Sequence, residues 1–182
     1  NTGNTKKVAE AIFEEIDGEK EIIPIDKIDS IDGYDITFLG FPIKQMGPDK
    51  KTKKFLNKHC IDGRNVVLFI THAAPEGNPD LQPMLDKFRR EASRAHIVDM
   101  FDCQGELSKA VKRIMSIMPN ADLRRWAKED NSFGQPDETR IEKARAFTRE
   151  VMAKFRNNYQ EMDEKELSEN SEIVRVSDPV LT

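Results

Sequence analysis

The chain opens with Asn1-Thr2-Gly3-Asn4-Thr5 and runs directly into Lys6 and Lys7 at the start of a helix-patterned segment. A short loop of hydroxyl, amide and glycine residues before a helix offers backbone N–H donors to an anion, and the helix dipole adds to the attraction. The spacing matches neither a nucleoside-triphosphate loop nor the glycine-rich turn of a dinucleotide site. The loop therefore predicts a site for a small monophosphate. The alternative is that Thr2 or Asn4 is only a helix N-cap.

Composition describes one domain with an extension. The 182 residues are 37% hydrophobic and 34% charged, with a mean hydropathy of -0.66. No apolar run is long enough for a membrane span, and no signal peptide is visible. Cys60 and Cys103 form no Cys-x-x-Cys pair, and the histidines share no ligand spacing, so neither a disulfide framework nor a metal site is expected. These features favour a reducing cytoplasm.

Charge divides the chain at residue 157. Residues 158–182 carry seven acidic and two basic residues, a net charge of -5, which leaves +1 for residues 1–157. The nearly neutral body argues against nucleic-acid binding, because such proteins carry a basic face. The acidic first half of the tail should not fold alone. Its second half contains Ile173-Val174-Arg175-Val176, whose alternation could dock on a sheet edge or a neighbouring subunit and so form a homodimer.

Strand and helix patterns alternate along the body. Dense β-branched runs predict strands at residues 21–25, 35–40, 65–71 and 96–101, of which the first contains Pro24 and should be an edge strand. Apolar periodicity predicts helices at residues 5–16, 48–59, 80–94, 106–118 and 139–155, with an irregular stretch around Trp126. This order indicates a parallel sheet with helices on both faces.

The predicted phosphate loop has no strand before it. In such a fold the loop follows a central strand, whose absence would leave backbone groups of two neighbours unpaired. We therefore expect roughly ten further residues before Asn1, enough for one strand and its lead-in. The alternative is that Ile173–Val176 fills the gap.

Ligands of an open parallel sheet bind outside the carboxyl ends of the strands. Three predicted loops leave such ends: residues 2–5, residues 41–47 and residues 71–77. All three are rich in small or backbone-exposing residues, which let main chain approach a planar ligand edge-on.

At this point the chain resembles the flavodoxins. The resemblance covers residues 1 to about 155 and rests on five motifs in the expected order: Thr2–Thr5 before the first helix, Gly40-Phe41 at a strand end, residues 49–56, Phe101–Gly105, and residues 134–138 before the last helix. It implies a three-layer α/β sandwich with a five-stranded parallel sheet of order 2-1-3-4-5, whose first strand is absent from the chain.

The resemblance also implies bound FMN. The phosphate would be held by the first loop, and the isoalloxazine ring would lie between the second and third loops. The implied cofactor-binding residues are Asn1, Thr2, Gly3, Asn4, Thr5, Phe41, Pro42, Ile43, Lys44, Gln45, Thr71, His72, Ala73, Ala74 and Cys103.

Several of these positions depart from the family pattern. Pro42 stands where related sequences often have Trp, and the third loop offers His72 in place of an aromatic hydrocarbon ring, so the flavin should be less enclosed. Lys44 is unusual because flavodoxin flavins are generally ringed by acids; a position in solvent is the alternative. Cys103 fits a packing role as a buried single cysteine. The basic run Lys50–Lys54 is interpreted as a solvated helix face, with partner docking as the alternative.

The leading hypothesis is an FMN-binding electron carrier that moves one or two electrons between redox partner proteins. The first alternative is an FMN-dependent reductase, or its flavin subunit, acting on a quinone or another small acceptor, because the weak aromatic cover leaves room for a substrate. The second is a binding module that kept the fold without the flavin.

Overall fold

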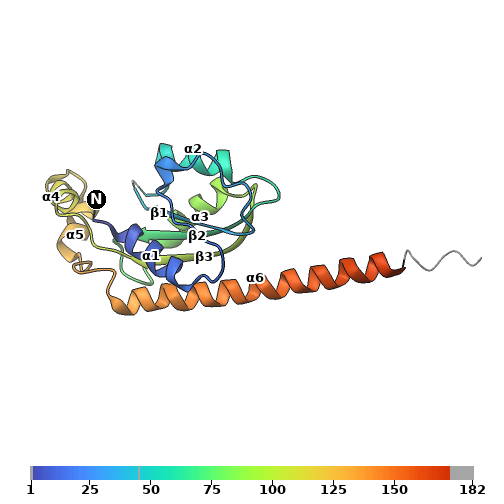
Figure 1. The fold of residues 1–182 in the computed structure, drawn as a ribbon. Helices are drawn as coiled ribbons and strands as arrows, with labels where there is room; N and C mark the ends of the chain where they lie inside the picture. Colours follow the sequence, from blue (N-terminus) through green and yellow to red (C-terminus); the bar gives the residue numbers. More distant parts are fainter. Residues whose placement is uncertain (1, 45, 173–182) are drawn as a thin grey trace, which may run out of the picture.

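The computed structural model describes residues 2–44 and 46–172, with side chains as far as residue 161. Along the chain (Figure 1) the elements are α1 (Asn4–Glu15), the 3₁₀ turn η1 (Ile25–Lys27), β1 (Thr37–Pro42), α2 (Lys50–His59), β2 (Asn65–His72), α3 (Leu81–Glu91), β3 (His96–Gln104), α4 (Lys109–Ile117), α5 (Ala121–Glu129) and α6 (Glu138–Glu172).

The sheet is parallel, as the alternation of strands and helices predicts. Its three strands lie in the order β1-β2-β3. Leu39 of β1 is paired with Leu68 of β2, and Thr71 of β2 with Cys103 of β3. The central strand β2 is buried from Val66 to its end, as expected for a strand covered on both faces. The described residues thus contain three of the five strands expected for the sheet.

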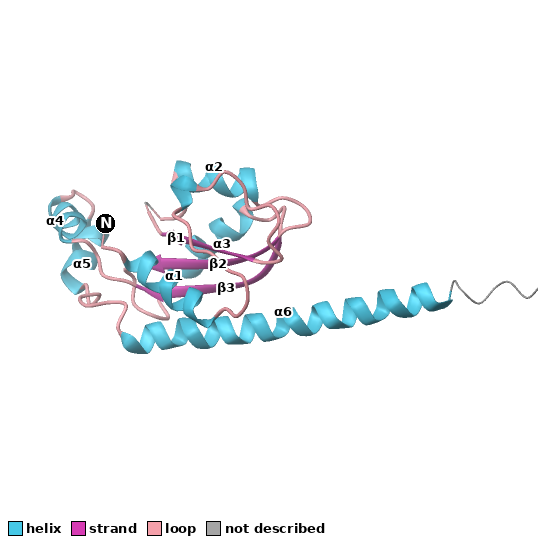
Figure 2. Cartoon of the chain, in the orientation of Figure 1, coloured by secondary structure: helices cyan, strands magenta, loops and turns pink. Residues whose placement is uncertain are grey.

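Alternating side chains of the strands face two separate layers of helices. Leu39, Leu68 and Ile70 pack in one core with residues of α2 and α3. Phe69, the neighbour of Leu68, points the other way and packs with Val8 and Ile12 of α1 and with residues of β3 and α6. The period of two in a strand therefore divides the interior into two cores. Figure 2 shows the sheet between these helices.

Helix α6 lies along α1 and is joined to it by charged side chains. Arg145 of α6 contacts Glu14 (Nη2–Oε2, 3.1 Å), Arg149 contacts Glu15 (Nη1–Oε2, 2.9 Å), and Arg156 contacts Asp17 (Nη2–Oδ2, 3.2 Å). Hydrogen bonds to Glu138 and then Glu14 raise the pKa of Arg145, and hydrogen bonds to Glu142 and then Glu15 raise that of Arg149. These pairs are largely exposed and add little individually, so they define the register of the two helices more than their stability.

The strand predicted at residues 21–25 is wrong. Residues 20–24 form neither strand nor helix, and the 3₁₀ turn η1 begins at Ile25. Ile22 and Ile23 stay 46% and 41% exposed. A strand needs a neighbouring strand with which its backbone can form hydrogen bonds, and the described residues place no strand beside this segment. Pro24 also lacks the backbone N–H that would donate one of these hydrogen bonds.

The region before α6 is more regular than expected. The stretch around Trp126 is helix α5, because Asn120 caps it: the Asn120 Oδ1 accepts from the N–H groups of Asp122 (2.8 Å) and Leu123 (3.2 Å). The preceding helix begins at Lys109, three residues later than predicted, because Ser108 is its N-cap and accepts from the Val111 N–H at 3.2 Å.

Helix α6 continues well past its predicted end near Phe155. Its backbone is helical to Glu172, so the expected domain boundary at residue 157 falls inside one helix. Residues 156–172 contain neither Gly nor Pro and include five Glu, a residue that favours helix. The segment Ile173–Val176 lies outside the described residues. The helices that the structure describes include none both long and apolar enough to cross a membrane.

A close approach between β1 and β2 yields a stability prediction. Gly40 is paired with Phe69, and a Cβ added at Gly40 would overlap the Phe69 ring. Gly40→Ala should lower the free energy of unfolding by roughly 1–3 kcal/mol through overpacking, measured by urea denaturation. In a Phe69→Leu background the same change should cost less, because the ring is gone. An equal cost in both backgrounds would contradict this explanation.

Candidate functional site

The loop before α1 leaves backbone donors free at the helix N-terminus. Gly3 is the N-cap residue, with φ 78°, and no side chain of the described residues caps the helix. The alternative to a phosphate site, that Thr2 or Asn4 is only the N-cap, is therefore wrong. The first hydrogen bond of this turn runs from the Lys7 N–H to the Gly3 carbonyl (3.0 Å), so the earlier amides have no intrahelical acceptor. The first turn has no acidic residue.

The two side chains that follow Gly3 connect this loop to the sheet. The hydroxyls of Thr5 and Thr71 lie 2.7 Å apart, and Asn4 Nδ2 donates to the Glu106 carbonyl at 2.9 Å. A Cβ at Gly105 would overlap the Asn4 side chain, so this glycine permits the close approach. Gly105 and Glu106 were not predicted as site residues; the quoted run Phe101–Gly105 was the signal that could have identified the first of them.

The second loop folds back on itself beside the end of β2. The Ile43 N–H donates to the Thr71 carbonyl at 2.8 Å, and Lys44 and Gly47 exchange two backbone hydrogen bonds of 2.9 and 3.2 Å. Met46 completes the turn with φ 68°. The sequence left two alternatives for Lys44, a position near the flavin or one in solvent. Its ammonium group lies 2.9 Å from Asp49 Oδ2. Gln45 lies outside the described residues.

Asp49 has a second role as the N-cap of α2. Its Oδ1 accepts from the Thr52 N–H at 2.8 Å. This hydrogen bond, followed by that from Lys44, lowers the pKa of Asp49 to about 2, because both favour the charged carboxylate. One carboxylate therefore holds the second loop and starts the helix behind it.

In the third loop, the His72 side chain is turned inward. Its ring is 2% exposed, with Nδ1 3.0 Å from the Ala74 carbonyl and Nε2 3.0 Å from Asp102 Oδ2. Carbonyl and carboxylate oxygens are both acceptors, so both hydrogen bonds form together only when the ring carries a proton on each nitrogen. His72 thus connects the loop to β3, and Ala73 and Ala74 are left half-buried at its surface.

A polar cluster behind the third loop was not predicted from the sequence. Gln104 is 1% exposed; its Nε2 donates to Asn131 Oδ1 (2.8 Å), and its Oε1 accepts from Arg140 Nη2 (3.0 Å). Arg140 Nε lies 3.3 Å from Glu76 Oε1 without an aligned hydrogen bond. Lys143 also pairs with Glu76, at 2.9 Å. These contacts fix the third loop to the start of α6, although the residues are spread too widely in sequence to form a motif.

Two further predicted site residues, like His72, have buried side chains. The Phe41 ring is 2% exposed and packs against the rings of Phe55 and Phe88, 6.0 and 6.2 Å away. The Cys103 thiol is 3% exposed and packs with Val8 and other residues of the second core. Burial raises the pKa of Cys103 to about 12. Only the backbone of these two residues could reach a ligand outside the strands.

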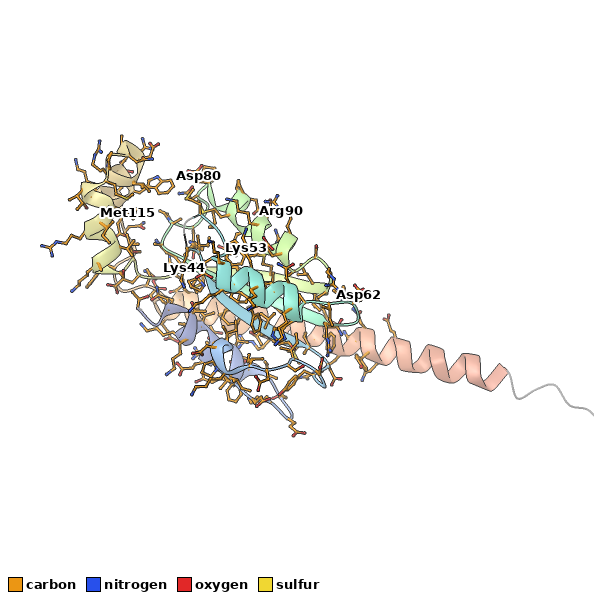
Figure 3. All side chains as sticks on the ribbon, turned by 90° about the horizontal axis from the view of Figure 1, so that it is seen from above. Lys44, Lys53, Asp62, Asp80, Arg90 and Met115 are labelled. Carbon is orange, nitrogen blue, oxygen red and sulfur yellow. The ribbon has the colours of Figure 1, made fainter. Side chains whose placement is uncertain are left out.

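The structure brings the three predicted loops together at one end of the molecule. Thr71 contacts both the first loop, through Thr5, and the second, through Ile43. Figure 3 shows Lys44 and Asp80 at this end, on the side of the body nearer to Met115 of α4, with Asp62 at the other end. Free amides at the start of α1 suit a phosphate, and half-buried Pro42, Ala73 and Ala74 suit the edge of a flat ring. The residues present therefore fit a flavin mononucleotide.

Comparison with known proteins gives one family and one relative. A model of the flavodoxin domain family matches residues 1–149. The flavodoxin-like domain-containing protein BilS of Clostridioides difficile (strain CD3) is 29% identical over 164 residues, covering 84% of this chain and 92% of that protein.

Substitutions of Asp49 separate its two roles. Asp49→Asn keeps an acceptor for the Thr52 N–H but loses the charge, whereas Asp49→Ala loses both. The Ala variant should lose about 0.5–2 kcal/mol of stability at neutral pH, and the Asn variant less. Because folding lowers the pKa of Asp49 from 3.8 to about 2, its charge stabilises the protein above about pH 4, and this contribution disappears as the pH falls toward 2.

The difference in unfolding free energy between wild type and Asp49→Asn should therefore shrink between about pH 5 and about pH 2. Chemical denaturation at each pH measures it. A difference that stays constant over this range would show that the charge of Asp49 contributes nothing to the folded state.

Proposed function

We infer that this chain, which belongs to the flavodoxin domain family, binds FMN and carries electrons between redox partner proteins. The observation that supports this most directly is the N-terminus of α1, where Gly3 caps the helix and the described side chains leave its first amides free. Such a terminus stabilises a phosphate by hydrogen bonds and by the helix dipole.

The phosphate would be held by the loop from Thr2 to Thr5. The Thr2 side chain is exposed, and Thr5 is half-buried beside Thr71. Because a hydroxyl both donates and accepts, Thr5 can accept from Thr71 and still donate to a phosphate oxygen. Lys7 adds positive charge in the first turn, which has no acidic residue, whereas Lys6 pairs with Glu10 (Nζ–Oε1, 3.4 Å).

The isoalloxazine ring would lie between residues 41–45 and residues 71–74, with less aromatic cover than is usual in flavodoxins. Phe41 and His72, the aromatic side chains of these two loops, are both turned into the protein interior. Contacts to the ring would then come from Pro42, from small residues and from backbone. When bound, FMN supplies one- and two-electron chemistry, and the protein supplies orientation and electrostatics.

The second candidate function is a reductase of quinones or other small acceptors. The inward orientation of Phe41 and His72 favours it, because a ring without an aromatic cover is open to a small substrate. Steady turnover of NAD(P)H and a quinone without a partner protein would support the reductase. No turnover by the flavin-loaded protein would favour the electron carrier.

Substitution of the phosphate loop tests flavin binding. Thr2→Ala with Thr5→Ala should weaken FMN binding by roughly tenfold or more for each hydrogen bond lost, since a hydrogen bond to a charged group contributes about 1.5–3 kcal/mol. Visible absorbance and fluorescence titration of apoprotein measure the affinity. Thr139→Ala is the matched control, because Thr139 is exposed in the first turn of α6. Wild-type protein without flavin affinity would favour the flavin-free binding module.

We also propose that the C-terminal arm, residues 158–182, supports a homodimer without taking part in the flavin site. Deletion of residues 160–182 keeps Arg156, the last residue of α6 paired with a residue just after α1. FMN affinity should be unchanged, while any dimer seen by sedimentation velocity should weaken. Loss of flavin with an unchanged oligomeric state would place the arm in the site instead.

A further inference from the structure

The α4–α5 hairpin, residues 109–129, presents an apolar surface that the rest of the described chain leaves uncovered. Helix α4 has no buried residue. Ten large apolar side chains are exposed among the residues whose side chains the structure describes, and five of them lie between Val111 and Phe133: Val111 (45%), Ile114 (56%), Ile117 (80%), Met118 (39%) and Phe133 (81%). Patches of this kind on a soluble protein mark interaction sites.

Ile114 and Ile117, the two most exposed large apolar side chains of α4, lie on the side of the helix that faces away from α5. Lys112 and Met115 are the partly buried residues of α4, and Lys112 Nζ pairs with Asp130 Oδ2 at 2.8 Å. At 100° per residue, Ile114 and Ile117 point away from these two positions. The hairpin therefore uses one side of α4 to hold α5 and leaves the opposite, apolar side to solvent.

The hairpin that carries these apolar side chains is also basic. The hairpin has six basic and two acidic residues, a net charge of +4. Arg125 pairs with Asp122 within the hairpin, whereas Lys109, Arg113 and Lys128 are exposed and have no salt-bridge partner among the described side chains. The surface of the hairpin thus combines exposed apolar side chains with exposed basic ones.

The hairpin stands next to the candidate flavin site. The segment leading into α4 receives the Asn4 side chain at the Glu106 carbonyl (2.9 Å), and the Gly105 N–H donates to the His72 carbonyl (2.7 Å). Both the first and the third loop therefore contact Gly105 and Glu106, in the segment that leads into the hairpin. Figure 1 shows α4 and α5 beyond the carboxyl ends of the strands, beside the N-terminus.

We propose that the exposed face of α4, with Phe133, is the docking surface for a redox partner protein that presents both apolar side chains and carboxylates. This inference rests on the proposed function, because the surface borders the loops assigned to FMN. The exposed basic residues of the hairpin fit an acidic partner. Electron-transfer complexes bury less than about 1,200 Å² in total, which a two-helix surface can supply.

The same charge argues against a second copy of the chain as the occupant. In a two-fold symmetric contact the same face meets itself, so two hairpins of charge +4 would be brought together. A lipid surface fits the apolar and basic chemistry, but it neither accepts nor donates electrons at the flavin end. These observations favour a protein partner over the other two occupants.

Binding of an acidic redox protein tests the proposal. The probe is reduced plastocyanin, a small acidic blue-copper protein, titrated into the ¹⁵N-labelled FMN-loaded protein and followed by NMR chemical shifts. Shifts should concentrate in residues 109–133. Ile114→Ser with Ile117→Ser, and separately Lys109→Glu with Arg113→Glu, should each weaken binding by roughly tenfold, and the charge pair should also flatten the salt dependence.

Matched variants control for loss of apolar area and of charge elsewhere. Ile22→Ser removes an exposed isoleucine far from the hairpin in sequence, and Lys51→Glu with Lys54→Glu reverses two exposed lysines of α2; both should bind plastocyanin as wild type does. The visible spectrum of each sample reports bound FMN. A spectrum without flavin refutes the proposed function, whereas full flavin content with unaltered binding in both hairpin variants refutes the docking surface alone.

Three further outcomes would overturn the proposal. No plastocyanin binding by wild type at millimolar concentration would exclude an acidic redox protein as the occupant. Wild-type protein could sediment with vesicles of phosphatidylcholine and phosphatidylglycerol, whereas Ile114→Ser with Ile117→Ser does not. That result would assign the face to lipid. A dimer that the same variant dissociates would assign it to a second copy.

Discussion

The carboxyl end of β2 at Thr71 is the point on which the candidate site depends. Its hydroxyl meets Thr5 of the phosphate loop, and its carbonyl accepts from Ile43 of the second loop. The next residue, His72, is fixed to Asp102 of β3. Because β2 is the buried central strand, the three loops are positioned by the most constrained part of the sheet. Displacing this strand end would therefore disturb all three loops together.

The sequence predicted those parts of the fold that depend on local patterns. The apolar runs at residues 35–40 and 65–71 became β1 and β2, and the Thr2–Thr5 loop lies at a helix start beside their ends. The run at residues 21–25 had similar composition without becoming a strand, because pairing requires a neighbour that local sequence does not specify. The Gln104–Arg140 contact joins residues 36 positions apart, so no short motif could reveal it.

Side chains that appear suited to a ligand are often used by the protein itself. The sequence offered His72 and Lys44 as groups near the flavin, and Cys103 as a packing residue beside it. In the structure His72 holds its own loop, Lys44 pairs with Asp49, and Cys103 fills the core. The residue types were visible in the sequence, but their orientation depended on tertiary partners. The groups that remain open toward a ligand are mainly backbone groups, and the type of a residue does not predict whether its backbone is accessible.

The length of α6 gives the molecule two distinct ends. At 1.5 Å per residue, the 35 residues from Glu138 to Glu172 span about 50 Å, and the helix starts near the hairpin and runs away from it (Figure 1). The end of α6 at Glu172 therefore lies far from the loops that surround Thr71. Helix α6 thus separates its C-terminal end from the proposed flavin site by most of its own length.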